Sequence, residues 1–280
     1  MHRLFSSLLA CAVLLGSFAL SMSVRQWVGR PSQAAYSTPE LYAHTIPALV
    51  HIFAVPSGDK TTLFAGTGFF VSADGYIMTA AHVVCEDPGN RICKRLFVRV
   101  RSGEYYTVVP VKIDLEHDVA LLRVVRGVQL VDKEKGIARM KFVDGELSSR
   151  RFEYLEIGES RIMGPGERVV VVGIPGKYGT LVAEGILSCS RSQVISMKME
   201  DATYRDVVLM GVMIFPGNSG GPVLNTRGEV VGIATVGTDR PISFFQRIEY
   251  AAALLSDSTA RVVTRRGLNY DKKYADDDDE

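Results

Sequence analysis

The sequence predicts an all-β protein whose strands form two groups of about six. Short runs rich in valine, isoleucine, tyrosine and phenylalanine recur from residue 46 onward, and runs of this kind favour strands. Glycine-containing turn signals separate them, for example Ala73-Asp74-Gly75-Tyr76 and Gly164-Pro165-Gly166. Little helical pattern lies between the runs, so two packed barrels fit better than an alternating α/β sheet.

The expected strands lie on either side of a charged segment at residues 126–151, which we expect to be an exposed connection or insertion. The first group comprises residues 48–55, 68–71, 76–79, 95–100, 105–113 and 119–125. The second group comprises residues 168–173, 181–188, 207–214, 222–224, 229–236 and 242–246. A short helix is expected at residues 248–255, where alanine, leucine and glutamate dominate.

These patterns divide the chain into five expected segments. They are a signal peptide or membrane anchor at 1–25, a polar linker at 26–45, a first barrel with a charged insertion near its end at 46–150, a second barrel at 151–255, and an acidic disordered tail at 256–280. The tail is expected because a run of like charges is normally solvated.

Residues 5–24 carry no charged side chain and follow Arg3. This run of twenty residues (24 − 5 + 1) exceeds the roughly 7–15 residues of a signal-peptide core and suits a membrane span. Five serines interrupt it, however, and Ala19-Leu20-Ser21 is compatible with a cleavage site. An uncleaved anchor and a cleaved export signal both remain open. Either one places the rest of the chain outside the cytoplasm, in a periplasm or secreted.

The balance of charges and the cysteine pattern limit the classes of function. The chain has 32 basic and 31 acidic residues, a net charge of +1, which argues against a nucleic-acid partner. It has no CxxC pair and no HExxH motif, so we predict neither a metal nor a cofactor. Cys85 and Cys93 bracket a Pro-Gly-Asn loop. In an exported protein they are candidates for a disulfide, and two ordinary thiols are the alternative.

One serine stands in an unusually glycine-rich stretch, Pro216-Gly217-Asn218-Ser219-Gly220-Gly221-Pro222. Glycine lets the backbone adopt positive φ and approach a ligand closely. The amides of Gly217 and Ser219, with Asn218 between them, are then expected to face one small space, as in an oxyanion hole. A serine hydroxyl is a weak nucleophile and needs a base.

His82 and Asp118 are the candidate base and acid. His82 ends the stretch Thr79-Ala80-Ala81-His82, in which small alanines allow the strand end to pack tightly. Asp118 directly precedes the apolar run 119–122, so it is expected near a buried surface, able to orient an imidazole. Taken singly, a histidine at a strand end and an aspartate before a strand are usually structural.

Together with Gly66-Thr67-Gly68-Phe69-Phe70-Val71, these motifs resemble those of the trypsin-like serine peptidases. The wording Gly-Asn-Ser-Gly-Gly-Pro is similar to the bacterial Deg (HtrA) branch. The order His82, Asp118, Ser219 is the chymotrypsin order. The resemblance covers roughly residues 46–255 and implies two six-stranded antiparallel β-barrels with the site between them. Only twenty-five residues follow Leu255, so the PDZ domain of Deg proteins is not expected.

The resemblance implies a serine endopeptidase in which Ser219 attacks a peptide carbonyl, His82 takes its proton and Asp118 orients His82. By analogy, Met213, Ala234, Thr235 and Val236 line the specificity pocket, which implies a preference for small or medium aliphatic side chains. Protein or peptide substrates are the expected partners, in extracytoplasmic protein processing or quality control. The membrane is a further partner if residues 5–24 stay attached, and no oligomer contacts are recognised. A catalytically silent binding or scaffold module is the alternative.

Overall fold

The computed structural model describes residues 35–56, 64–86, 91–132, 139–143, 149–189, 193–196, 203–238 and 240–256. The expected leader at residues 5–24 and the acidic tail beyond residue 256 lie outside these ranges. Within the ranges given, no helix is both long enough and apolar enough to cross a membrane.

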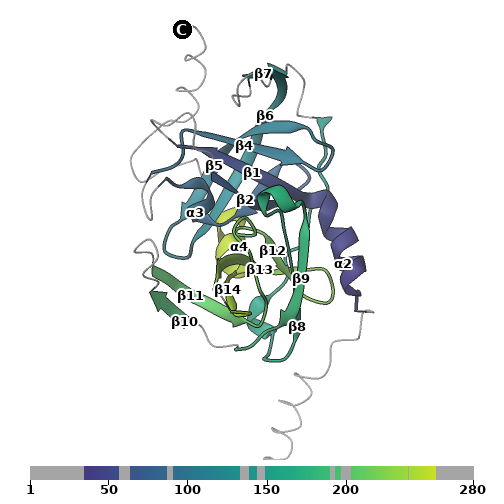
Figure 1. The fold of residues 1–280 in the computed structure, drawn as a ribbon, viewed down its shortest axis with the longest axis vertical. Coiled ribbons are helices and arrows are strands. Elements are labelled where there is room, and N and C mark those ends of the chain that lie inside the picture. Colours follow the sequence, from purple (N-terminus) through teal and green to yellow (C-terminus); the bar gives the residue numbers. More distant parts are fainter. Residues whose placement is uncertain are drawn as a thin grey trace, which may run out of the picture. The chain divides into compact units, whose positions relative to one another are not determined.

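The predicted all-β fold is confirmed, and its first sheet closes into a barrel (Figure 1). The order is β3-β2-β1-β4-β5-β6-β7, and an additional pairing of β3 with β6 joins six of the strands into a ring. All the pairings in this sheet are antiparallel. The strands are β1 Leu49–Val55, β2 Phe64–Phe70, β3 Tyr76–Thr79, β4 Arg95–Val100, β5 Tyr105–Asp114, β6 Val119–Asp132 and β7 Arg139–Val143.

The second sheet has the order β10-β11-β14-β13-β12-β8-β9. A single antiparallel bridge between Leu187 and Met210 connects the ends of β9 and β11. It is flanked by hydrogen bonds from Ser188 N–H to Leu209 O (3.0 Å) and from Gly211 N–H to Ile186 O (2.9 Å). The strands are β8 Arg168–Gly173, β9 Leu181–Ile186, β10 Gln193–Ser196, β11 Thr203–Met210, β12 Pro222–Leu224, β13 Val230–Gly237 and β14 Ser243–Arg247.

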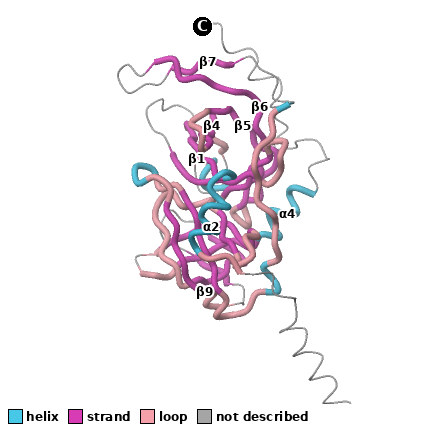
Figure 2. Tube along the Cα trace, turned by 90° about the vertical axis from the view of Figure 1, so that its right-hand side faces the viewer, coloured by secondary structure: helices cyan, strands magenta, loops and turns pink. Residues whose placement is uncertain are grey.

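The charged segment at 126–151 differs from the expected exposed connection. Strand β6 continues to Asp132 and pairs with β7, with Gly127 opposite Val143 and Leu130 opposite Met140; both views show the two strands running alongside each other (Figures 1 and 2). The β-forming residues at 128–131 are surrounded by charged residues. The composition of the whole segment therefore did not indicate that it contains two paired strands. Strand β10 was also not expected.

The predicted linker at 26–45 contains a helix, α2 (Thr38–Thr45), followed by the 3₁₀ turn η1 (Ile46–Ala48). Ser37 precedes the helix, and its backbone N–H and Oγ both donate to the Glu40 carboxylate at 2.7 Å. These bonds from Ser37 to the side chain of Glu40, together with Pro39 in the first turn, favour helix initiation. Leu41 is fully buried, so α2 is part of the folded core and the linker prediction was wrong there.

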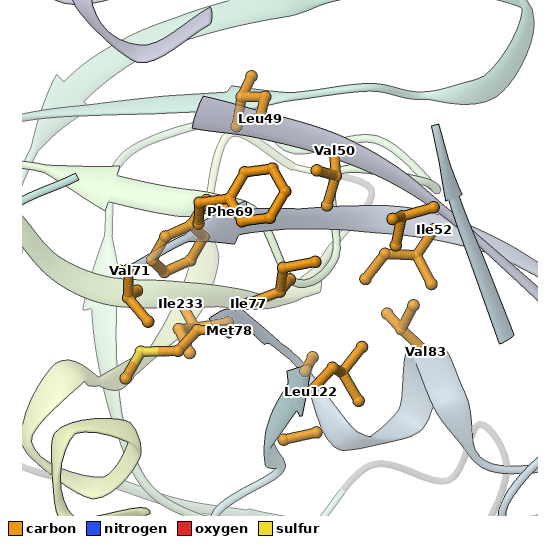
Figure 3. Close-up of a cluster of buried hydrophobic side chains, with 14 of the residues drawn as sticks. Leu49, Val50, Ile52, Phe69, Val71, Ile77, Met78, Val83, Leu122 and Ile233 are labelled. Carbon is orange, nitrogen blue, oxygen red and sulfur yellow. The ribbon is translucent and has the colours of Figure 1, made fainter. Parts of the chain in front are cut away.

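A hydrophobic cluster joins residues of the two sheets (Figure 3). Phe69, Ile77 and Leu122 come from the first sheet and Ile233 comes from the second, and all four are fully buried. The C-terminal helix α4 (Ile248–Ser256) adds Ile248 and confirms the helix expected there. Burying one large apolar side chain contributes roughly 1.5–3 kcal/mol, so this shared cluster holds the two sheets together. The remaining short helices are α3 Ala81–Val84, η4 Ser160–Ile162 and η5 Gly176–Tyr178.

His51 on β1 predicts a pH dependence of stability. Burial, and then the positive charge of Arg99, lowers the pKa of His51, and its Nε2 has no partner within the described part of the chain. At pH values below the ordinary histidine pKa of about 6.5, His51 therefore binds a proton in the unfolded chain but stays neutral in the folded protein until the pH is lower. Stability from this group is present above that pH and is lost as the pH falls through it.

We expect acidification from pH ~7.5 to ~5.5 to lower the melting temperature of the wild type more than that of His51→Gln. Scanning calorimetry of both proteins at the two pH values measures the difference. Equal decreases in the two proteins would contradict the assignment.

Candidate active site

His82 and Asp118 meet because β3 and β6 are paired, with Thr79 opposite Ala120. His82 lies in α3, directly after β3, and Asp118 lies in the turn directly before β6. The Asp118 carboxylate accepts two hydrogen bonds from the same residue. His82 Nδ1 lies 2.8 Å from Oδ2, and the His82 backbone N–H donates to Oδ1 at 2.9 Å. The carboxylate therefore fixes both the backbone and the ring of His82.

This pairing determines which ring nitrogen of His82 carries the proton. An ionised carboxylate only accepts hydrogen bonds, so the proton of the neutral imidazole is held at Nδ1 and Nε2 keeps its lone pair. The Asp118 side chain is 8% exposed, whereas that of His82 is 34% exposed. Asp118 also has a φ of +52°, a left-handed conformation that is uncommon outside glycine and that concentrates at functional sites.

The Ser219 turn (residues 215–222) packs against the segment that precedes His82. Gly220 has a φ of +84°, and a Cβ built on it would lie 2.1 Å from Thr79 Oγ1 and 3.0 Å from Ala80 N. Only glycine fits this contact, because both the conformation and the space exclude a side chain. The Ser219 hydroxyl donates to Thr235 O at 3.3 Å. The predicted serine and histidine segments are thus in direct contact.

The backbone amides of the Ser219 turn differ in whether they have a hydrogen-bond acceptor. The N–H of Asn218 donates to Phe215 O at 2.9 Å, closing a turn in which Gly217 has a φ of +98°. Within the described part of the chain, the N–H groups of Gly217 and Ser219 have no acceptor. Of the three residues predicted for the oxyanion hole, Asn218 therefore uses its backbone N–H in a hydrogen bond within the turn. Two backbone donors without an acceptor are suited to bind a negatively charged oxygen if they face the same space.

The turn before β6 packs against helix α4. The Asp114 carboxylate binds His117 Nδ1 at 2.7 Å, and the His117 ring stacks on Tyr250 with centroids 3.6 Å apart. The Tyr250 hydroxyl donates to Asp206; burial, and then this hydrogen bond, raises the pKa of Tyr250 to about 12. His117 thus interacts with Asp114 and Tyr250, whereas the neighbouring Asp118 binds His82.

The four residues predicted for the specificity pocket are in different environments. Met213 is 41% exposed, whereas Ala234, Thr235 and Val236 are buried. Ala234 belongs to the hydrophobic cluster of the second sheet, and Thr235 Oγ1 donates to the backbone oxygen two residues before it. Among these four residues, only Met213 presents a large exposed surface.

A close contact beside Met213 was not predicted. A Cβ built on Gly237, the last residue of β13, would lie 2.8 Å from Ile214 O and 2.9 Å from Ile214 Cγ1. The backbone after Met213 therefore passes very near the end of β13. Phe215, the next residue along, is 46% exposed.

Cys85 and Cys93 are both buried and are free thiols in the structure, and the disulfide between them stays a prediction. Burial raises the pKa of Cys85 to about 12 and that of Cys93 to about 11. Disulfide formation proceeds through a thiolate, and burial makes the thiolate scarce at neutral pH.

The fold and this arrangement of residues define the class of protein. Residues 66–233 match the family model described as a trypsin-like peptidase domain. The chain belongs to this family.

Its relatives include HtrA serine proteases. It is 32% identical over 234 residues to serine protease HTRA1 of Xenopus laevis, covering 81% of this chain and 44% of that protein. It is 29% identical over 222 residues to serine protease HTRA3 of Homo sapiens, covering 78% of this chain and 42% of that protein. The chain thus spans less than half the length of these relatives.

Solved structures support the same fold. The structure titled HtrA-type protease AlgW with tripeptide superposes with a TM-score of 0.58 at 22% sequence identity. The match covers 79% of this chain and 63% of that one.

Proposed function

We propose that the protein is a serine endopeptidase with Ser219 as nucleophile, His82 as base and Asp118 as the group that orients His82. The observation that carries the proposal is the pairing of His82 Nδ1 with a buried carboxylate. The amides of Ser219 and Gly217, which have no acceptor within the described part of the chain, support it. Membership of the trypsin-like peptidase family supports the same assignment.

In the proposed reaction, Ser219 Oγ adds to the carbonyl carbon of a peptide bond while its proton passes to His82 Nε2. Negative charge develops on the carbonyl oxygen, which accepts hydrogen bonds from the Gly217 and Ser219 amides. Collapse breaks the C–N bond, and the leaving amine takes the proton from His82. Water then hydrolyses the acyl-enzyme by the same route, and Asp118 stabilises the imidazolium in both halves.

A fluorophosphonate probe tests this proposal, because it phosphonylates only a serine that is activated. We expect stoichiometric labelling of the wild-type protein, with the label on Ser219 in a peptide map. An unlabelled but folded wild-type protein would overturn the proposal and favour the silent scaffold module.

We further propose an extracytoplasmic location, in protein processing or quality control. The uncharged run at residues 5–24 supports it, since such a run engages export machinery. Amino-terminal sequencing of protein recovered from an exporting host separates the two forms. An amino terminus near residue 21 indicates a cleaved signal, and an intact terminus in the membrane fraction indicates an anchor. Recovery of intact protein in the cytosol would contradict both.

The proposed substrates have a small or medium aliphatic side chain before the cleaved bond. Met213, Ile214 and Phe215 carry no charge, so none of them would pair with a lysine or arginine side chain of a substrate, and Gly237 lies close against Ile214. Profiling with a peptide library should therefore give cleavage after valine, alanine or isoleucine at least about tenfold faster than after lysine, since one or two methylenes are worth roughly that factor. Robust cleavage after lysine or arginine would contradict this specificity.

A further inference from the structure

We propose that Thr67, on β2 of the first sheet, is a positioning residue whose hydroxyl holds the Ser219 turn in its competent shape. The inference rests on the proposed function and assigns a role that none of the three motif residues performs. Thr67 does not reach the reacting atoms in this proposal; it acts through the backbone of Gly217 and Ser219.

Three of the hydrogen bonds that Thr67 makes reach the Ser219 turn or the residue that follows β8. Its Oγ1 donates to Gly217 O at 2.7 Å and accepts from the N–H of Ile174 at 2.8 Å. Its backbone N–H donates to Ser219 O at 2.9 Å. Thr67 is fully buried. The hydroxyl therefore both donates and accepts a hydrogen bond, and its two partners lie in the segment after β8 and in the turn before β12.

The bond to Gly217 O completes the restraint of one peptide group. Its N–H end, on Asn218, is fixed to Phe215 O, and its carbonyl end is fixed to Thr67 Oγ1. Glycine has no side chain to restrict rotation, so Gly217 keeps its φ of +98° only while its neighbours hold it. The Gly217 N–H itself belongs to the preceding Pro216–Gly217 peptide. Losing the Thr67 bond releases the backbone dihedrals of Gly217 that set the angle between the two peptides, so the Gly217 N–H can then turn away from the substrate oxygen.

The bond from Ile174 ties a second segment to the same hydroxyl. Ile174 follows β8, and a Cβ built on Gly217 would lie 2.7 Å from the Cα of the next residue, Pro175. The residues after β8 thus pack directly on the Ser219 turn. Without the Thr67 hydroxyl, the Ile174 N–H and the Gly217 carbonyl would both lose a partner, and unsatisfied buried groups drive rearrangement.

Thr67→Val tests the role of the hydroxyl, because it removes the oxygen and keeps the side-chain volume. We expect fluorophosphonate labelling to slow by about 10- to 100-fold, less than the 10²–10³ that follows complete loss of an oxyanion donor. Thr67→Ser keeps the hydroxyl and should label within about threefold of the wild-type rate.

Thr45→Val is the matched control for loss of a buried threonine hydroxyl. Thr45 is also fully buried, and its Oγ1 donates to Leu41 O at 2.6 Å within helix α2, without contact with the Ser219 turn. We expect Thr45→Val to lower the melting temperature about as much as Thr67→Val but to leave the labelling rate unchanged. The control thereby separates positioning from general destabilisation.

Amide hydrogen exchange gives a readout that does not require activity. In Thr67→Val the Ile174 and Asn218 amides should exchange at least about tenfold faster than in the wild type, because a tenfold change corresponds to losing roughly one hydrogen bond. Thr67→Ser and Thr45→Val should leave both amides protected.

The outcomes are distinguishable. Wild-type labelling and exchange rates in Thr67→Val would overturn the inference and leave the proposed function standing. An unlabelled wild type with faster exchange in Thr67→Val would instead overturn the proposed function and keep the positioning role.

Discussion

Ser219→Ala is expected to lower peptide hydrolysis by a factor on the order of 10⁴ to 10⁶, because the variant has no oxygen to form the acyl-enzyme. Fluorophosphonate labelling should disappear entirely. The folded state should change little, since the substitution removes only the 3.3 Å hydrogen bond to Thr235 O. Hydrolysis of a fluorogenic peptide, together with a thermal melt, measures both effects.

Ser160→Ala is the matched control for this substitution. Ser160 is buried, and its hydroxyl donates to the Glu249 carboxylate at 2.6 Å, outside the candidate active site. The variant should lose some stability and keep its full rate of labelling. Residual turnover by purified Ser219→Ala above about one per cent of the wild-type rate would mean that another nucleophile operates.

Asp118→Asn is expected to lower the rate of labelling and of peptide hydrolysis by about 10⁴. The asparagine oxygen can still accept from the His82 backbone N–H, but its NH₂ group would then face His82 Nδ1. The imidazole proton is thereby driven to Nε2, where it blocks acceptance of the Ser219 proton. The comparison of first-order labelling rates with those of the wild type measures this loss.

Asp114→Asn provides the same chemical change a few residues away. Its carboxylate binds His117 and the backbone of residues 116 and 117, with no contact to His82. We expect its rates to stay within about tenfold of the wild type, because it alters only the support of the turn. Equal losses in Asp118→Asn and Asp114→Asn would show that the turn, rather than the orientation of His82, matters.

The strands were predictable where turn or charged residues border an apolar run. Strands β3, β4, β8 and β12 begin and end at the residues expected from the sequence, and each has glycine, proline or charged residues at its borders. Strand β7 was missed because its partner lies in a charged segment, and pairing of that kind depends on the neighbouring strand. Helix α2 was missed because its cap, Ser37 with Glu40, is a local signal in an otherwise polar stretch.

The site was predictable to the extent that each group carries its own motif. His82 and Asp118 stand next to small or apolar residues that distinguish them from the other histidines and acids. Thr67 lies in the motif at residues 66–71, but the motif does not indicate its role, because that role depends on hydrogen bonds to Gly217 and Ile174, more than one hundred residues away in each case. Hydrogen bonds of that range follow only from the packing of the two sheets.

The residues predicted for the specificity pocket show a second limit of prediction from sequence. Simple alternation along a strand assigns side chains to its two faces, but the pairing of β13 with β14 shifts between Ala234 and Val236. Such an irregularity re-aims the side chains beyond it. The sequence around Thr235 contains no residue that indicates this shift, so counting positions along β13 does not predict which way its side chains point.

A crystal structure of the phosphonylated protein tests the account most directly. We predict phosphorus bonded to Ser219 Oγ, with the phosphoryl oxygen within hydrogen-bond distance of the Gly217 and Ser219 amides and with the His82–Asp118 pair intact. A probe attached to another residue, or a phosphoryl oxygen pointing away from both amides, would contradict the account.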